Sequence, residues 1–258
     1  MSKFVSYKVN NQGICFVELN RSPVNALSFD FLKSIQKTFS LINSNKSIKV
    51  VILKSSLPHF SAGADLKERK IMSKKDANKA LDNFNNCFST IENLNQPTIC
   101  LINGYCLGGG AELSLAFDFR IASDDALIGF PEVSIGIIPG AGGTYRLPKI
   151  IGFSNAKYWI LTAKKFNSDE SKDFGFLNFC TSKNDLESFA VKLASDIIAN
   201  APIAIKSAKR AINESFNCKV DDGLKIERDN YKVALNTKDR DEALNAFIEK
   251  RKPKWKNK

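Results

Sequence analysis

The spacing of apolar residues along the chain separates strands from helices. Residues 4–9 and 14–19 are rich in β-forming side chains and flank the turn sequence at residues 10–13, which predicts an antiparallel hairpin. Short apolar runs are typical of strands that are buried on both faces. Four such segments are expected to form further strands: residues 49–54, 98–102, 119–122 and 127–130.

Two other segments carry apolar residues at helical spacing. The first follows Ser28, a residue type that caps helices, and its apolar positions are Phe31, Leu32, Ile35, Phe39 and Ile42. The second follows Ser73-Lys74-Lys75-Asp76, which resembles a capping box, and its apolar positions are Leu81, Phe84, Phe88, Ile91 and Leu94. Because each set lies on one helix face, we expect both helices to pack against the core.

The order strand, loop, helix recurs along the first part of the chain and favours an α/β core. Beyond Gly152 the pattern becomes helical, and Pro202 fits a first-turn position. The expected helices cover residues 154–163, 168–173, 184–199, 202–216, 223–235 and 239–250. We therefore predict an α/β core over residues 1–199 and a C-terminal helical region over residues 200–258.

Composition limits the class of protein. The chain has 258 residues, 43% of them hydrophobic, which is enough for a sizeable core. No apolar run reaches the ~18 residues that a membrane span needs, and the first residues lack the pattern of an export or transit signal. We expect a cytoplasmic protein with no membrane partner. The six cysteines form no Cys-x-x-Cys pair, which favours reduced and mostly buried side chains.

The chain has one histidine and many lysines. A single histidine, His59, argues against a common serine–histidine triad and against multi-histidine metal sites, and its loop position favours a structural or solvent-facing role. The net charge of +11, from 38 basic and 27 acidic residues, favours anionic partners such as phosphate-bearing ligands or nucleic acid. Apart from a cluster at residues 250–256, the lysines are spread along the chain, as on a solvated surface.

Two glutamates in glycine-rich surroundings are the strongest chemical signal. Glu112 follows Gly108-Gly109-Gly110, and Glu132 precedes the turn-rich run at residues 139–143. Glycine clusters let a backbone approach a ligand closely, and paired carboxylates can give and take protons. The two glutamates therefore predict acid/base chemistry beside a bound carbonyl group.

Backbone donors for such a carbonyl are predicted in the same regions. The N–H groups at the start of the helix after residues 108–110 can face an oxyanion, and the small-residue turn at residues 61–65 can supply a second donor. Tight helix–strand packing is the alternative role of the triple glycine. The phosphate loop and the Gly-x-Ser-x-Gly elbow are absent from the sequence, and the dinucleotide fingerprint is incomplete.

Three motifs, in this order, closely resemble those of the enoyl-CoA hydratase/isomerase (crotonase) superfamily. They are Ser61-Ala62-Gly63-Ala64-Asp65 within residues 60–68, Gly108-Gly109-Gly110-Ala111-Glu112 within residues 103–113, and Pro131-Glu132 with Pro139-Gly140-Ala141-Gly142-Gly143 within residues 131–144. Residues 19–27 and 247–252 extend the likeness to nearly the whole chain. The resemblance implies a spiral of β-β-α units and a C-terminal helical region that assembles homotrimers, often paired into hexamers.

The resemblance also implies roles for individual residues. Ala64 and Gly109 match the positions whose N–H groups hold the thioester oxygen of acyl-CoA. Glu112 matches the carboxylate that helps to activate the water added to trans-2-enoyl-CoA, and Glu132 matches the one that handles the proton at the carbon beside the thioester. Gly140 matches a backbone position close to that water. The resemblance implies no metal or redox cofactor, and coenzyme A enters as part of the substrate.

Contacts with coenzyme A are implied at four positions. Ala62 would lie near the adenine and Lys67 near the phosphates, whereas Phe247 and Lys250 would come from a neighbouring subunit. The pathway this chemistry suggests is fatty acid metabolism, with amino-acid breakdown and butanoate metabolism as alternatives.

Other functions stay open at this point. Isomerases of the family, which only move a double bond, typically lose the carboxylate that matches Glu112, so retention of both glutamates favours hydration. A nucleic-acid binder would use the positive charge, yet the sequence has no zinc-ligand spacing, no RNP-like aromatic pattern and no dense basic helix. A structural protein without activity would not need the glutamate pair. Phe84, Phe88 and Tyr145 are candidate walls of the acyl pocket.

Overall fold

The computed structural model describes residues 3–258 and divides into two compact units. The first unit runs to Leu94 and resumes over Thr98–Val191, whereas the second comprises Asn95–Pro97 and Lys192–Lys258. This division falls within the segment 184–199, the helix that the sequence places at the end of the α/β core. Met1 and Ser2, part of the N-terminal segment considered for an export signal, lie outside the described residues.

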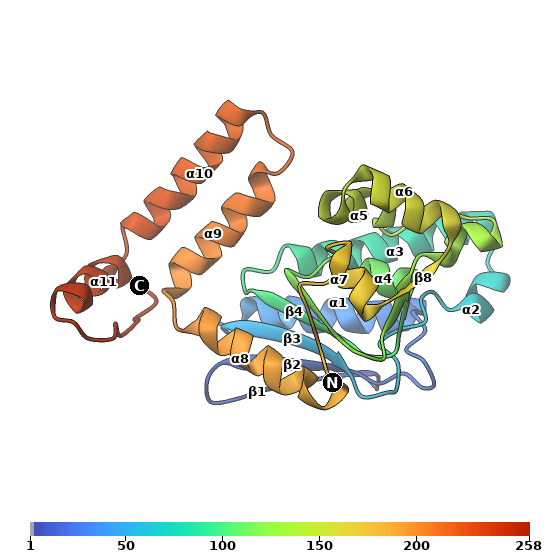
Figure 1. Ribbon diagram of the computed structural model, residues 1–258, viewed down its shortest axis with the longest axis horizontal. Helices are drawn as coiled ribbons and strands as arrows, with labels where there is room; N and C mark the ends of the chain where they lie inside the picture. The colour runs from blue at the N-terminus through green and yellow to red at the C-terminus, as the bar shows by residue number, and fades with distance from the viewer. Residues whose placement is uncertain (1–2) are drawn as a thin grey trace. The chain divides into compact units, whose positions relative to one another are not determined.

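A six-stranded sheet forms the base of the first unit, with strand order β1-β2-β3-β4-β6-β9 (Figure 1). The strands are β1 (Val5–Val9), β2 (Ile14–Leu19), β3 (Val50–Ser55), β4 (Thr98–Ile102), β6 (Phe119–Ser123) and β9 (Phe179–Thr181). β1 and β2 pair antiparallel, which confirms the predicted hairpin, and the other neighbouring strands pair in parallel. The apolar runs of β3 and β4 are buried, as the sequence predicts.

A second sheet of three short strands positions the glycine-rich segments. Its order is β5-β7-β8, with β5 (Tyr105–Leu107), β7 (Leu127–Gly129) and β8 (Lys165–Asn167). β5 follows β4 after a turn at Gly104, where φ is +55° and a Cβ atom would lie 2.4 Å from the Pro58 carbonyl oxygen. The chain then enters helix α4 (Gly109–Ser114). This β-β-α unit and the mixed architecture confirm the predicted fold class.

Helices cover the sheets of the first unit. Helix α1 (Phe29–Ser44) begins after Ser28, whose Oγ accepts a hydrogen bond from the Phe31 amide, and it buries the predicted face. Helix α3 (Lys74–Glu92) begins after Ser73, whose Oγ accepts from the Asp76 amide. The Ser73 hydroxyl also donates to the Asp76 carboxylate, and only one half of the predicted capping box forms. The other helices are α2 (Leu66–Lys70), α5 (Gly143–Ile151), α6 (Phe153–Thr162), α7 (Ser168–Asp173), and the 3₁₀ helices η1 (Pro131–Ile135) and η2 (Lys183–Asp185). Helix α8 (Leu186–Ile198) begins in the first unit and ends in the second.

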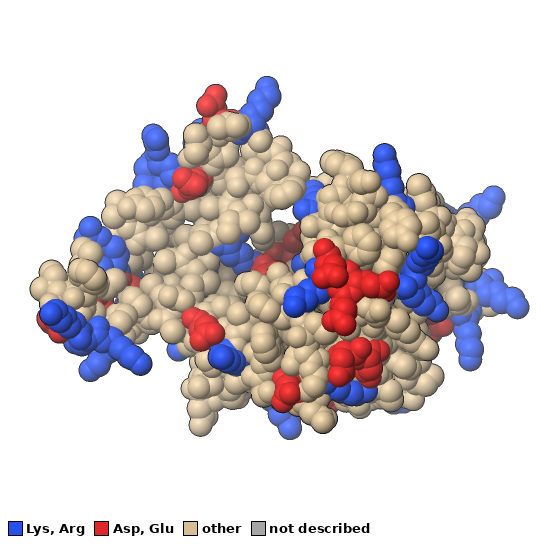
Figure 2. All heavy atoms as spheres, viewed as in Figure 1, with Lys and Arg blue, Asp and Glu red and all other residues tan. Residues whose placement is uncertain are grey.

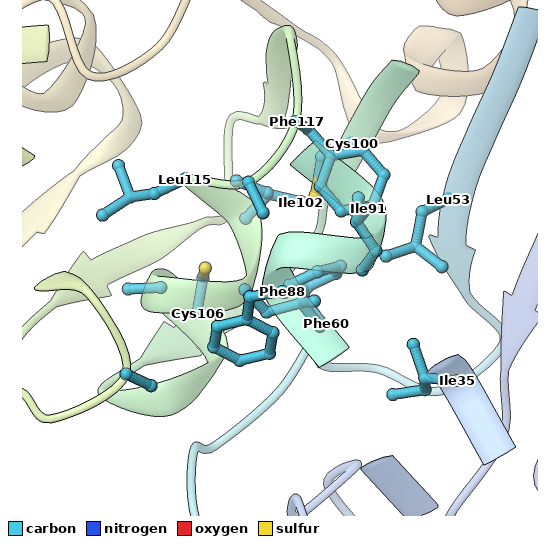
Figure 3. Packing of buried hydrophobic residues seen from close by; sticks show 14 of the residues in the cluster. Ile35, Leu53, Phe60, Phe88, Ile91, Cys100, Ile102, Cys106, Leu115 and Phe117 are labelled. Carbon is cyan, nitrogen blue, oxygen red and sulfur yellow. The ribbon is translucent and has the colours of Figure 1, made fainter. Parts of the chain in front are cut away.

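The core of the first unit lies between these helices and the sheets. Phe88 and Ile91 from α3 join Cys100 and Ile102 from β4 and Cys106 from β5 in one buried cluster (Figure 3). Burying one phenylalanine or isoleucine side chain contributes about 1.5–3 kcal/mol to the free energy of unfolding. The cysteines are free, and most are buried as small apolar side chains, as the sequence predicts.

The second unit is helical. Helices α9 (Pro202–Ser215) and α10 (Val220–Leu235) pack against each other as a hairpin, and α11 (Lys238–Ile248) follows (Figure 1). Pro202 is the first residue of α9, as predicted. The Asp239 carboxylate in α11 is buried and accepts hydrogen bonds from the amides of Lys256 and Asn257. The end of the chain is thereby held against α11.

Several expectations about local structure need correction. Residues 153–191 are not purely helical, because β8 and β9 lie among them. These strands and β5 have three residues each, too few to show a periodic pattern. Helix α5 follows the turn-rich run at residues 139–143, where no helix is expected because its glycine start and Pro148 both argue against one. Helix α2, which the sequence analysis does not expect, begins at Leu66, directly after the small-residue turn at residues 61–65.

The surface carries scattered charge. Figure 2 shows lysine and arginine side chains spread over the visible face, with acidic side chains among them. Within residues 3–258 no single helix is both long and apolar enough to span a membrane, although two helices joined at a bend, Lys183–Ile198 and Pro202–Ser215, meet the length and composition test together.

Candidate active site

Glycines let the segments of the site come into contact. Gly108, at the turn from β5 into α4, has φ +51°, and a Cβ atom there would lie 2.9 Å from Glu132 Oε1. A Cβ atom on Gly110 would lie 2.6 Å from the Ser61 carbonyl oxygen. Any side chain at these two positions would push α4 away from Glu132 on one side and from the 61–65 turn on the other.

Two backbone amides without acceptors lie side by side. A Cβ atom on Gly63 would be 3.3 Å from the Gly109 nitrogen, and one on Gly109 would be 3.4 Å from the Ala64 nitrogen. Neither the Ala64 amide nor the Gly109 amide donates a hydrogen bond to another described residue. Both residues line one pocket. The structure thus brings together the two positions predicted to hold a thioester oxygen.

Residues 19–27 hold the 61–65 turn in place. Arg21 forms an ion pair with Asp65 at 2.8 Å and donates to the Ala26 carbonyl oxygen at 2.7 Å. Asn25 is fully buried, and its side chain donates to the Phe60 carbonyl oxygen at 3.0 Å and accepts from the Arg21 amide at 2.7 Å. The N-terminal motif therefore acts on the site through the backbone that carries Ala64.

Glu112 is buried and held by the loop before α5. Its Oε1 accepts hydrogen bonds from the amides of Ala141 and Gly143, each at 2.8 Å. A Cβ atom on Gly143 would lie 3.0 Å from that oxygen, so this close approach requires glycine. Burial raises the pKa of the Glu112 carboxyl, whereas the two amide hydrogen bonds lower it. Because both amides bind Oε1, Oε2 is left free of hydrogen bonds from residues 3–258.

An arginine clamps the same loop from its other side. Arg146 is buried, and its Nη1 donates to the Ala141 carbonyl oxygen at 3.1 Å. Its Nε and Nη2 bind both carboxylate oxygens of Glu92, at 3.2 and 2.7 Å. Gly142 has φ +100°, and a Cβ atom there would collide with the guanidinium. The clamp fixes the peptide unit that lies between the two amides that hold Glu112.

Glu132 lies in a different environment. Its side chain is buried on η1, and its Oε2 accepts no hydrogen bond from the described residues. Burial raises the pKa of Glu132 to about 7, and the nearby charge of Glu112 adds to the rise. A buried carboxyl oxygen without a donor is stabilised by protonation. Glu132 is therefore suited to carry a proton near neutral pH.

The two glutamates and the two amides share a pocket of about 400 Å³. Gly140 also lines this pocket, and a Cβ atom there would lie 2.8 Å from Leu81. The charged side chains Arg69 and Lys70 enter from α2. The apolar lining residues are Leu66, Ala77, Leu81, Phe84, Ile135, Ile137, Ile138 and Ala141.

Only one of the three candidate aromatic walls belongs to this pocket. Phe84 lines it, with Cε1 3.1 Å from the position of a Cβ atom on Gly109. Phe88 is fully buried in the core, and Tyr145 is exposed and stacks under the Lys149 ammonium, so neither is among the lining residues. Phe88 lies on the same face of α3 as Phe84 but one turn, about 6 Å, further along the helix, where it packs in the core.

The remaining predicted residues lie outside the pocket lining. Ala62 and Lys67 are exposed next to the 61–65 turn. Phe247 and Lys250 are exposed residues of the second unit. His59 is structural: its ring stacks on Tyr105 at 4.3 Å and its Nδ1 accepts from the Tyr105 amide. No group of three or more His, Cys, Asp or Glu side chains within residues 3–258 is placed to hold a metal ion.

The sequence did not indicate Arg69, Arg146 or the isoleucines of the pocket. Asp65 caps α2 by accepting from the amides of Lys67 and Glu68, and this N-cap signal could have revealed the helix that carries Arg69. Arg146 pairs with Glu92, which is distant in the sequence, so no local pattern could have indicated this pair.

Comparison with known proteins agrees with this geometry. The family model described as "Enoyl-CoA hydratase/isomerase" matches residues 9–258. The chain is 42% identical over 247 residues to "Probable enoyl-CoA hydratase 2, mitochondrial" of Arabidopsis thaliana, covering 95% of this chain and 82% of that protein. It is 39% identical over 252 residues to "Methylglutaconyl-CoA hydratase, mitochondrial" of Mus musculus, covering 95% and 80%. The crystal structure of an enoyl-CoA hydratase from Bacillus anthracis is similar with a TM-score of 0.96 and 40% identity, over 99% of this chain and 100% of that one.

Proposed function

The chain belongs to the enoyl-CoA hydratase/isomerase family, and we propose that it is a hydratase, which adds water across the double bond of a trans-2-enoyl-CoA to give a 3-hydroxyacyl-CoA. The observation that carries this proposal is the pocket shared by Glu112, Glu132 and the amides of Ala64 and Gly109. Two carboxylates with different environments can manage two protons, and the amides can bind the thioester oxygen.

The first step forms the bond between oxygen and C3. Glu112 accepts a proton from water through its free Oε2, and the water oxygen adds to C3. The electron pair of the double bond moves through C2 and C1 onto the thioester oxygen, which becomes an enolate. The Ala64 and Gly109 amides donate to this oxygen, and loss of one such donor costs about 3–4 kcal/mol of transition-state stabilisation in a well-studied hydrolase.

The second step places a proton on C2. Glu132 is the donor, because burial and the missing hydrogen-bond partner of Oε2 favour its protonated form. The enolate collapses to the thioester as C2 takes this proton. Glu112 then holds one proton and Glu132 none, and transfer of that proton back to Glu132 restores the starting state. The backbone at Gly140, in the same pocket, would support the water.

Binding of coenzyme A and self-association complete the proposal. Ala62 and Lys67 are exposed beside the turn that carries Ala64, a position that fits contacts with the adenine and the phosphates. The second unit would form the contacts of a homotrimer or hexamer and would offer Phe247 and Lys250 to a neighbouring subunit. Its large exposed apolar side chains support such an interface: Ile212, Phe216, Val220, Leu224, Tyr231, Val233, Phe247 and Ile248.

Glu112→Gln tests the hydratase assignment. The amide oxygen of glutamine can still accept from Ala141 and Gly143, so the fold should be retained while the base is lost. We expect hydration of crotonyl-CoA, followed by loss of the enoyl thioester absorbance, to fall by about 10²- to 10⁴-fold. Glu187→Gln changes an exposed glutamate paired with Lys54 and serves as the control with unchanged rate.

The same variant separates hydration from isomerisation. An isomerase would need only Glu132 to move a proton between C2 and C4, so conversion of a 3-enoyl-CoA would survive in Glu112→Gln. If the variant hydrates crotonyl-CoA at the original rate, the assignment of Glu112 as the base is wrong. If the unchanged protein converts only the 3-enoyl substrate, it is an isomerase.

A further inference from the structure

The pocket has a second charged end besides the glutamate pair. Among residues 3–258 the other charged lining residues are Arg69 and Lys70, both from α2, in a wall that is otherwise mainly apolar. Water addition at C2 and C3 uses the glutamates and the two amides, and it leaves these cations without a role. A charged group in an apolar pocket wall indicates an opposite charge on the ligand.

Arg69 is half-buried and has no acidic partner. Its guanidinium carbon lies 5.3 Å from the centre of the Phe84 ring, and Nη1 donates to the Ala77 carbonyl oxygen at 3.5 Å. It forms no ion pair with a described residue. The neighbouring Glu68 accepts from the Phe29 amide instead, at 3.0 Å. Arg69 is thus a partly desolvated cation whose charge is not compensated at close range.

One aromatic ring links this cation to the thioester end of the pocket. The Arg69 guanidinium lies over the ring of Phe84. The Cε1 atom of the same ring lies close to Gly109, one of the two residues whose amides face the pocket. Burial lowers the pKa of Arg69, whereas the charges of Glu68 and Glu112 raise it, which places Glu112 near enough to interact but not within ion-pair distance. A short acyl chain would fit between the amides and the guanidinium.

We propose that Arg69 binds a free carboxylate at the far end of the acyl chain, so that the preferred substrate is the 2-enoyl-CoA of a short dicarboxylic acid. This inference rests on the proposed hydratase function. The planar guanidinium offers a fork of donors that matches a carboxylate in bidentate geometry. Lys70 adds a second positive charge on the same side. The aliphatic residues Leu66, Leu81 and Ile138 would enclose the methylene groups between the two ends.

Two simpler roles of Arg69 make different predictions. If Arg69 only stabilises the ionised form of Glu112, its removal lowers kcat for every enoyl-CoA by the same factor. If Arg69 binds a phosphate of coenzyme A, its removal raises KM for every enoyl-CoA by the same factor. Only carboxylate binding makes the loss in kcat/KM larger for an enoyl-CoA with a terminal carboxylate than for one without it.

The test compares crotonyl-CoA with glutaconyl-CoA, a 2-enoyl-CoA that carries a terminal carboxylate. We expect the unchanged protein to prefer glutaconyl-CoA in kcat/KM. In Arg69→Gln the loss in kcat/KM should be about 10- to 100-fold larger for glutaconyl-CoA than for crotonyl-CoA. Arg69→Lys should restore part of the preference, because it keeps the charge but not the fork. Arg210→Gln, at an exposed arginine of α9, controls for loss of surface charge.

The outcomes separate the two proposals. Equal losses on both substrates in Arg69→Gln would overturn carboxylate binding, and so would a preference of the unchanged protein for crotonyl-CoA. Hydration of neither substrate by the unchanged protein would instead contradict the proposed function. A melting temperature of Arg69→Gln close to that of the unchanged protein shows that a selective loss reports on the ligand and not on folding.

Discussion

Replacing Arg146 should lower kcat while leaving KM nearly unchanged. Arg146 donates to the carbonyl oxygen of Ala141, and the amide of the same residue donates to Glu112. The arginine does not line the pocket, so it does not contact the acyl chain there. Arg146→Met keeps an unbranched side chain of similar length and removes the donors. The peptide unit between the two amides that hold Glu112 then loses this support.

The structure sets the size of the effect. Leaving the Ala141 carbonyl oxygen without a donor costs about 1–3 kcal/mol of unfolding free energy. The pair with Glu92, whose side chain is 39% exposed, adds at most about 1 kcal/mol because water screens it. A total of about 1–4 kcal/mol lowers the melting temperature by roughly 2–16 °C for a unit of this size. A shift of about 1 Å in a reacting group can cost about 100-fold in rate, so we expect kcat to fall about 10- to 100-fold.

Thermal unfolding and crotonyl-CoA kinetics, measured well below the melting temperature, check both parts. Glu92→Gln keeps the hydrogen bond from Arg146 to Ala141, so its free energy of unfolding should fall by less than about 1 kcal/mol. Its kcat should fall far less than that of Arg146→Met. If Arg146→Met is destabilised but retains its kcat, the loop holds Glu112 without the clamp and the reasoning fails. A rise in KM with constant kcat would mean that the loop acts in binding.

Two further predictions concern pH and assembly. Hydration requires Glu132 protonated and Glu112 ionised, so kcat/KM should fall as the pH rises through about 7, where Glu132 loses its proton. The reaction takes up no net proton, so dehydration of 3-hydroxybutyryl-CoA must show the same decline, and a flat profile over roughly pH 6–9 would argue against this role. Gel filtration should give a mass of three or six subunits, and elution at the mass of one subunit would refute the proposed assembly.

Regular elements with many residues could be predicted from sequence, and the short ones could not. Helix α1 shows its cap at Ser28 and its buried face in the sequence, and β3 and β4 appear as apolar runs. The short strands β5, β8 and β9 form because they pair with neighbouring strands of the two sheets. Their own sequences carry no apolar pattern long enough to predict a strand. Helix α5 forms despite its glycine and Pro148, since tertiary contacts such as the Arg146 clamp hold it.

The candidate site was predictable where one motif carries both the residue and its neighbourhood. The triple glycine before Glu112 marks a close backbone approach, and the structure shows that the approaching groups are Ser61 and Glu132. The pocket walls were not predictable, because α2, α3, η1 and the loop before α5 each supply only a few residues. The contact between these four segments depends on packing between parts of the chain that are distant in the sequence.

The two glutamates differ in a way that no motif records. In the sequence both are carboxylates beside glycines, and only the family resemblance, not the surrounding residues, implies which one is the base. In the structure two amides bind Glu112, whereas Oε2 of Glu132 is buried without a donor. Burial raises the pKa of both carboxyls, but at Glu112 the two amide hydrogen bonds oppose this rise, whereas the pKa of Glu132 is raised to about 7. This difference between the two environments supports the proposed roles of Glu112 as the base and Glu132 as the acid. The assignment comes from the loop at Ala141, which reaches Glu112 and not Glu132.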